Sequence, residues 1–190
     1  MALVLNGSND TITGLQINSA NIVNGSITSA DLASGAITSS ALPSGSVIQY
    51  KSGIIADINN RASTNSSTYT TTGIHIDITP TNANNKIIID GRVAQYHDNS
   101  GIQHEFRIHN GTSLDSNQEQ GIAAGQDNAW HMVNIHYEQI AGTTSEMTFT
   151  LYHARTAGSS GTAYVGWTSS GGGSTTYYNW QYFNAIEVVV

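Results

Sequence analysis

The fold class is decided by the stretch Gly73-Ile74-His75-Ile76-Asp77-Ile78-Thr79-Pro80 and by Lys86-Ile87-Ile88-Ile89, which follows it. Apolar and polar residues alternate over 74–78, which predicts a strand with one face toward a core and one toward solvent. Residues 86–89 are almost continuously apolar, which predicts a strand that is covered on both faces. The turn-forming Pro80-Thr81-Asn82 separates the two. This stretch therefore predicts strand, turn and strand.

The same pattern continues on both sides of this stretch. Alternation recurs at 106–109, 147–152 and 163–167, and Asn110-Gly111 is a strong hairpin signal. The chain from Val47 onward is predicted to contain roughly eight or nine strands, which is typical of an antiparallel sandwich or barrel. Ile186-Glu187-Val188-Val189-Val190 reads as a further strand without a polar tail. We expect this strand to be docked in a sheet or held at a subunit contact.

The first quarter of the chain has a different pattern. Aliphatic residues recur at every fifth position, separated almost only by Ser, Thr, Asn, Ala and Gly. These residues, called the stripe below, are Ile12, Ile17, Ile22, Ile27, Leu32, Ile37, Leu42 and Val47. A period of five fits neither a plain helix nor a plain strand. Each ten-residue unit, such as Gly25–Ser34, is expected to contain one extended piece and one helical turn.

Three structures are compatible with such a stripe. A single-chain pentapeptide β-helix needs about 20 residues per coil, so this segment would complete too few coils to be stable. A flexible linker does not account for eight aliphatic residues in register. The third structure is a parallel bundle of sister chains, each turning its stripe toward a common axis. We favour this bundle, with three chains as the expected number.

Composition excludes several classes of function. The chain has 190 residues, of which 10% are charged, and a net charge of −7, without a run of Lys or Arg. Nucleic acid is therefore not an expected partner. No apolar run approaches the ~18 residues of a membrane span, so no membrane insertion is expected. Cysteine is absent, which removes disulfides, thiolate nucleophiles and Cys-type zinc sites.

The remaining residues do not predict catalytic or metal chemistry. His104 and His109 resemble a zinc motif, but their odd separation in a strand points them to opposite faces. Residues 115–121 resemble a calcium loop, but the glycine falls one place late and the flanking helices are missing. Neither a G-x-S-x-G elbow nor a phosphate loop occurs. We expect no enzymatic activity, no catalytic residue, no cofactor and no metal site.

Aromatic residues are the clearer sign of a binding role. Tyr177, Tyr178, Trp180 and Tyr182 lie in one stretch after a glycine-rich turn. Tyrosine and tryptophan combine apolar area with a polar group, which suits the binding of sugars or proteins. These residues are candidate ligand-binding aromatics. The alternative is that they form a core strand or a trimer contact.

The chain resembles bacteriophage fibre proteins. The resemblance rests on the opening Leu3-Val4-Leu5-Asn6-Gly7, the decapeptides of the type Gly-Ser-Ile-Thr-Ser-Ala-Asp-Leu-Ala, and Gly45-Ser46-Val47-Ile48-Gln49. It extends to 73–80 with the following 84–89, to Gly161-Thr162-Ala163-Tyr164 and to the closing Asn184-Ala185-Ile186-Glu187-Val188. It implies a homotrimer with a virion-attachment segment over residues 1–12, a repeat shaft over 13–46 and an all-β head over 47–190. The head would be an antiparallel β-sandwich of the jelly-roll type.

The expected function follows from this resemblance. The protein would be a virion structural protein made in the host cytoplasm and displayed as a surface appendage of the virion. Its N-terminus would bind other virion proteins of the tail or capsid, and its head would bind a host-surface glycan or protein. The alternative is a capsid decoration, or cement, protein that stabilises the shell. A carbohydrate-acting enzyme is the remote alternative.

Overall fold

The computed structural model divides the chain into two compact units, Met1–Thr38 and Ser39–Val190. The residues that it describes are 22, 24–28, 30–33, 36–38, 41–54, 62–99, 101–115, 120–124, 130–157, 160–165 and 181–190. Among these residues, no helix has the length and apolar character needed to cross a bilayer.

The described part of the first unit consists of short hydrogen-bonded turns. The Asp31 carboxylate accepts hydrogen bonds from the backbone N–H of Thr28 at 2.8 Å and from its hydroxyl at 2.6 Å. The Asp31 N–H donates to the Thr28 carbonyl at 3.0 Å, and the Ala36 N–H to the Ala33 carbonyl at 2.9 Å. Each of these turns stands between two stripe residues. Asp31 thus closes the turn that the repeat predicts at this place.

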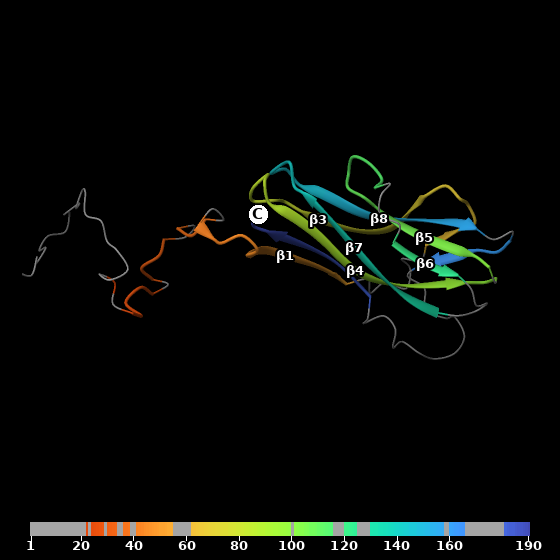
Figure 1. Cartoon of the computed structure of the whole chain (residues 1–190), viewed down its shortest axis with the longest axis horizontal. Coiled ribbons are helices and arrows are strands. Elements are labelled where there is room, and N and C mark those ends of the chain that lie inside the picture. The colour runs from red at the N-terminus through yellow and green to blue at the C-terminus, as the bar shows by residue number, and fades with distance from the viewer. Residues whose placement is uncertain are drawn as a thin grey trace, which may run out of the picture. The chain divides into compact units, whose positions relative to one another are not determined.

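The second unit is built from antiparallel strands (Figure 1). Ten strands are described: β1 (Val47–Ile54), β2 (Ala62–Thr64), β3 (Thr70–Ile78), β4 (Lys86–His97), β5 (Gln103–His109), β6 (Gln120–Ala124), β7 (Trp130–Ile140), β8 (Met147–Ala157), β9 (Ala163–Val165) and β10 (Tyr182–Val188). They confirm the predicted strands at 74–78, 86–89, 106–109 and 147–152. The strand predicted over 163–167 is described as far as Val165.

The strands form two sheets with jelly-roll topology. Sheet A contains β1, β10, β4 and β7 in that order, with the short β9 and β2 beside the far end of β4. Sheet B has the order β3-β8-β5-β6. The pairs β1–β10, β3–β8, β4–β7 and β5–β6 are nested, as in one long hairpin that is rolled into two layers. The predicted all-β, jelly-roll-like sandwich is therefore confirmed.

Alternating side chains of both sheets fill the core. Ile74, Ile76 and Ile78 of β3 point inward, and the residues between them are exposed. Phe106, Phe149 and Phe183 are the largest fully buried side chains. Phe183 packs over Gly91 of β4, where an added Cβ would lie 2.8 Å from the phenyl ring. Glycine at position 91 thus leaves room for the ring in the middle of a strand.

One strand prediction is corrected by the structure. Ile87 and Ile89 of β4 are fully buried, but Ile88 between them is only half-buried. The run 86–89 was expected to be covered on both faces. Sheet B covers one face, and the described residues leave the other face of this strand partly open.

Candidate functional site

The stripe residues of the first unit are exposed wherever they are described. Exposed fractions are 44% for Ile22, 54% for Ile27, 44% for Leu32 and 57% for Ile37. In the second unit, Leu42 is half-buried and Val47 is 61% exposed. Ile12 and Ile17 lie outside the described residues. Five of the six described stripe residues are therefore left exposed in one chain.

The outer face of sheet A carries a second group of apolar side chains. The first row of this face runs across four strands. Its residues, in order, are Val47 of β1, Val188 of β10, Lys86 of β4 and Ile140 of β7. A bulge between Val47 and Gln49 adds one residue to β1 and shifts the alternation of its side chains. The next side chain of β1 on the outer face is therefore that of Tyr50.

The second row of this face is apolar over three strands. Tyr50 pairs with Ile186, Ile186 with Ile88, and Ile88 with Glu138. Tyr50 is 56% exposed, while Ile88 and Ile186 are half-buried. The Lys86 ammonium lies 3.2 Å from the Glu138 carboxylate and joins the two rows.

We call this surface the apolar face. Its members are Val47, Tyr50, Ile88, Ile140, Ile186 and Val188, and Val190 follows just beyond the end of β10. The sequence alone does not predict this surface, because its members come from four strands that are far apart in the chain. The signals it left were the apolar run 86–89 and the apolar residues 186–190.

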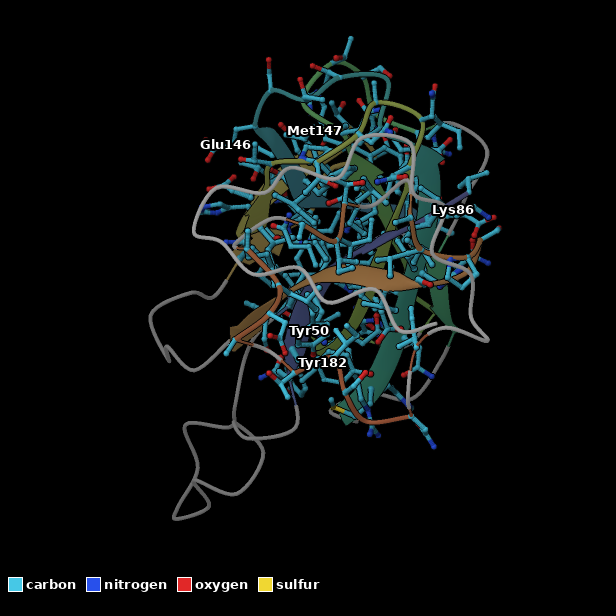
Figure 2. All side chains as sticks on the ribbon, turned by 90° about the vertical axis from the view of Figure 1, so that its left-hand side faces the viewer. Tyr50, Lys86, Glu146, Met147 and Tyr182 are labelled. Carbon is cyan, nitrogen blue, oxygen red and sulfur yellow. The ribbon has the colours of Figure 1, made fainter. Side chains whose placement is uncertain are left out.

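Of the candidate ligand-binding aromatics, only Tyr182 lies among the described residues. It is half-buried on β10, on the same side of sheet A as Tyr50 (Figure 2). Burial and the nearby Asp90 carboxylate raise the pKa of Tyr182 above its ordinary value. Tyr177, Tyr178 and Trp180 fall outside the described residues.

The outer face of sheet B is polar and aromatic instead of aliphatic. Tyr152 of β8 pairs with Arg107 of β5, and its ring stacks on His109 with centroids 5.3 Å apart and planes 25° apart. The Arg107 guanidinium carbon lies 4.4 Å from the centre of the Tyr69 ring, a cation–π contact. We call Tyr69, Glu105, Arg107, His109 and Tyr152 the aromatic face.

Glu105 holds the aromatic face in place. Its carboxylate accepts a hydrogen bond from the Tyr69 hydroxyl at 2.6 Å and another from the Thr156 hydroxyl. Burial and the Glu105 carboxylate raise the pKa of Tyr69, so this phenol stays a neutral donor. The result is a surface of fixed rings with one guanidinium, which can stack on apolar patches of a ligand and donate hydrogen bonds to it.

Three histidines are fully buried between the two sheets. They are His97, His104 and His153. His104 Nε2 lies 3.0 Å from His153 Nδ1, at hydrogen-bonding distance. Within the described part of the chain, no group of three or more His, Cys, Asp or Glu is arranged to hold a metal ion. His104 is buried and His109 lies on the outer side, so the prediction that these two point to opposite faces is confirmed.

A polar pocket of about 540 Å³ lies between the turn that follows β5 and the connection from β7 to β8. Its lining consists of Asn110, Gly111, Thr112, Gln139, Ala141, Gly142, Thr143, Glu146, Met147 and Thr148. Figure 2 labels Glu146 and Met147 at this end of the head. The Asn110 amide donates to Gln139 at 2.9 Å, so the amides of this lining are occupied with one another.

Comparison with known proteins adds little to these observations. No protein-family model and no curated protein matches the sequence. The solved structures that resemble the chain include infectious bursal disease virus of the Gx strain, at 11% identity and a TM-score of 0.40 over 74% of this chain, and of the Gt strain, at 13% identity and 0.41 over 77%. The VP2 subviral particle of that virus gives 12% identity and a TM-score of 0.39 over 74%. This chain spans only 36–39% of the length of those chains, and at this similarity nothing is transferred to it.

Proposed function

We propose that this chain is a virion structural protein, a homotrimeric surface fibre whose jelly-roll head binds a host-surface glycan or protein. The observation that carries the proposal is the exposed stripe. Ile22, Ile27, Leu32 and Ile37 all keep between 44% and 57% of their surface exposed in one chain. Removing aliphatic side chains from water lowers the free energy, so a partner that covers this regular stripe is stabilising.

Identical chains are the partner that fits a regular stripe. Copies that run in parallel present the same residue at the same height, and closed cyclic symmetry leaves no stripe uncovered. Three copies also carry three equal heads on one shaft, so weak individual contacts add up to strong adhesion. Residues 1–12 then serve as the attachment to the tail or capsid.

The aromatic face supports a binding role for the head. Tyrosine rings and an arginine offer stacking area and directional donors at low entropic cost, which suits glycans and protein loops. Tyr177, Tyr178, Trp180 and Tyr182 remain candidate ligand-binding aromatics, of which the structure describes Tyr182. We propose a binding protein without catalytic activity, cofactor or metal.

Two measurements test this function. The molar mass of the full chain in solution should be three times that of one chain, and a monomer would refute the fibre. The purified trimer should then compete with virions for adsorption to host cells. Tyr152→Ala should weaken this competition, whereas the matched control Tyr50→Ala, outside the aromatic face, should leave receptor affinity unchanged when tested at a concentration where it is trimeric.

Capsid decoration remains the alternative, since the same trimer can sit on a shell. For a decoration protein, we expect that the trimer does not compete with virions for adsorption. We also expect that it raises the temperature at which capsids fall apart. A trimer that binds cells and leaves capsid stability unchanged supports the fibre. The remote alternative, a carbohydrate-acting enzyme, would release reducing ends from the receptor glycan.

A further inference from the structure

We propose that the apolar face of sheet A is the surface through which three copies of the head contact one another, so that the aromatic face of sheet B points outward. The inference rests on the proposed homotrimer and specifies how its heads are arranged. The occupant of the apolar face is a second copy of this chain.

Continuity along the chain links this face to the stripe. Val47 is the last stripe residue and also the first residue of β1, where it opens the apolar face beside Val188. If the stripes of three chains surround one axis, the three copies of Val47 lie close to that axis. The sheet surface that continues from Val47 through Tyr50 then faces the same axis.

The distribution of exposed apolar side chains supports the same arrangement. Among the described residues, the large hydrophobic side chains that are exposed fall into two groups. One group is the stripe, and the other consists of Val47, Tyr50, Ile140 and the adjoining Val190, at 61%, 56%, 50% and 64% exposure. Exposed apolar side chains that gather on one face of a sheet mark an interaction site.

The outer face of sheet B does not share this character. Along β3 the outward residues include Thr71, His75 and Asp77, all exposed, and on β8 Thr148 donates to the Asp77 carboxylate at 2.6 Å. Charged and hydroxyl groups of this kind lose hydration when they are buried without new partners. Subunit contact through the apolar face is therefore more favourable than contact through these polar residues of β3 and β8.

The proposed contact is mainly apolar and includes one ion pair. Lys86 lies between Val188 and Ile140 in the first row, and its partner Glu138 lies beside Ile88 in the second row. The buried core of a homo-oligomer interface is more apolar than the rest of the protein surface. The tether of the shaft raises the effective concentration of the heads, so a modest patch is sufficient for association.

Distances between spin labels test this arrangement in the full chain. The natural chain has no cysteine, so single-cysteine variants can be labelled without background. Glu138→Cys places the label beside the apolar face, and His75→Cys places it on the exposed surface of sheet B. We expect the distance between labels of different copies to be shorter for Glu138→Cys. If the protein has a trimeric mass but the two distances are equal, or the distance for His75→Cys is the shorter, this inference is overturned. The proposal of a trimeric fibre would still stand. A monomeric mass with no coupling for either label would refute the fibre itself.

Charge substitutions provide a second test. Tyr50→Glu with Ile140→Glu should raise the concentration at which the full-length trimer dissociates by at least about tenfold, since each ~1.4 kcal/mol corresponds to a factor of ten. Thr70→Glu with His75→Glu adds the same number of carboxylates to exposed positions of sheet B and serves as the matched control. Circular dichroism shows whether each variant keeps its β structure. Equal dissociation of folded wild type and Tyr50→Glu/Ile140→Glu would exclude the apolar face as the contact.

Discussion

Glu187 is a fully buried carboxylate that is held by the turn between β3 and β4. One oxygen accepts hydrogen bonds from the Thr81 N–H and hydroxyl, both at 2.8 Å, from the Asn85 amide at 2.7 Å and from the Asn82 N–H at 3.3 Å. The Gln49 amide donates to the other oxygen at 3.3 Å. Burial raises the pKa of Glu187, but these hydrogen bonds outweigh burial and lower the pKa below its ordinary value. The carboxylate thus fixes the entry to β4.

Glu187→Gln should lower the free energy of unfolding by about 1.5–3 kcal/mol, because hydrogen bonds to a charged group are lost and an amide faces the same donors. Chemical denaturation at neutral pH measures this loss. The exposed Glu138→Gln is the control, and should cost at most about 1 kcal/mol. Because the pKa of Glu187 is lowered on folding, its stabilising effect is lost as the pH falls below the ordinary carboxyl value near 4.5. The difference between wild type and Glu187→Gln should therefore shrink in acid, and a constant difference would contradict this account.

The buried pair His104 and His153 makes the head sensitive to acid. Burial lowers the pKa of His153 from 6.5 to about 4, and burial with the neighbouring His153 and His97 lowers the pKa of His104 well below 6.5. Asp98 and His131 act on the pKa of His97, which lies beside the pair. In the folded state both rings of the pair stay neutral at a pH where the unfolded chain is already protonated.

Stability should accordingly fall as the pH is lowered from 6.5 toward about 4, because the unfolded state binds more protons in this range. The expected slope is roughly 1.4 kcal/mol per pH unit for each histidine that remains neutral only when folded. His104→Leu with His153→Leu removes both partners together and should flatten the dependence. His75→Leu changes an exposed histidine and should leave it unchanged. Urea unfolding over this pH range measures all three, and an unchanged slope in the double variant would contradict the assignment.

At the scale of elements, the repeat segment combines turns closed by local hydrogen bonds with an uncovered stripe. The Thr28–Asp31 turn involves residues within one repeat, so it needs no partner chain. Ile27 and Ile37 on either side of this turn have no such local cover. We therefore expect the aliphatic residues to control assembly and not the turn.

Ile27→Asp with Ile37→Asp should convert the trimer to monomers, because burying an unpaired carboxylate at an apolar axis costs on the order of several kcal/mol. Sedimentation or light scattering measures the mass at matched concentrations. Ser26→Asp with Ala36→Asp places the same charges at neighbouring, exposed positions and should keep the trimeric mass. A trimer that survives the stripe substitutions would remove the stripe from the interface.

At the scale of the whole molecule, attachment and receptor binding are expected to be separable. Deletion of residues 1–12 should abolish incorporation into virions, since that segment is proposed to contact other virion proteins. The same deletion should leave the mass trimeric and cell binding intact, because most of the stripe and the whole head remain. Immunodetection on purified particles and cell adsorption of the free protein check the two halves. Normal incorporation of the shortened chain would move the attachment site elsewhere.

The strands and the stripe could be predicted from the sequence because their signals are local. Alternation along 74–78 and 147–152 depends on residues that are neighbours in the chain, and the structure places β3 and β8 there. The stripe is likewise a spacing between near neighbours. The candidate site was predicted less well: of the four aromatic residues proposed, only Tyr182 is described, and the aromatic face formed by Tyr69, Arg107 and Tyr152 was not anticipated.

The sequence alone thus determined that the chain is all-β, where its main strands lie, and that its first quarter carries a stripe with a period of five. Only the tertiary structure decided that β4 pairs with β10 and β7, that Glu187 caps a turn more than 100 residues away, and that Ile88 stays half-buried. The physical reason is that periodicity shows which side chains of a strand share a face. Which strands meet, and in which register, depends on packing between segments that are distant in the chain.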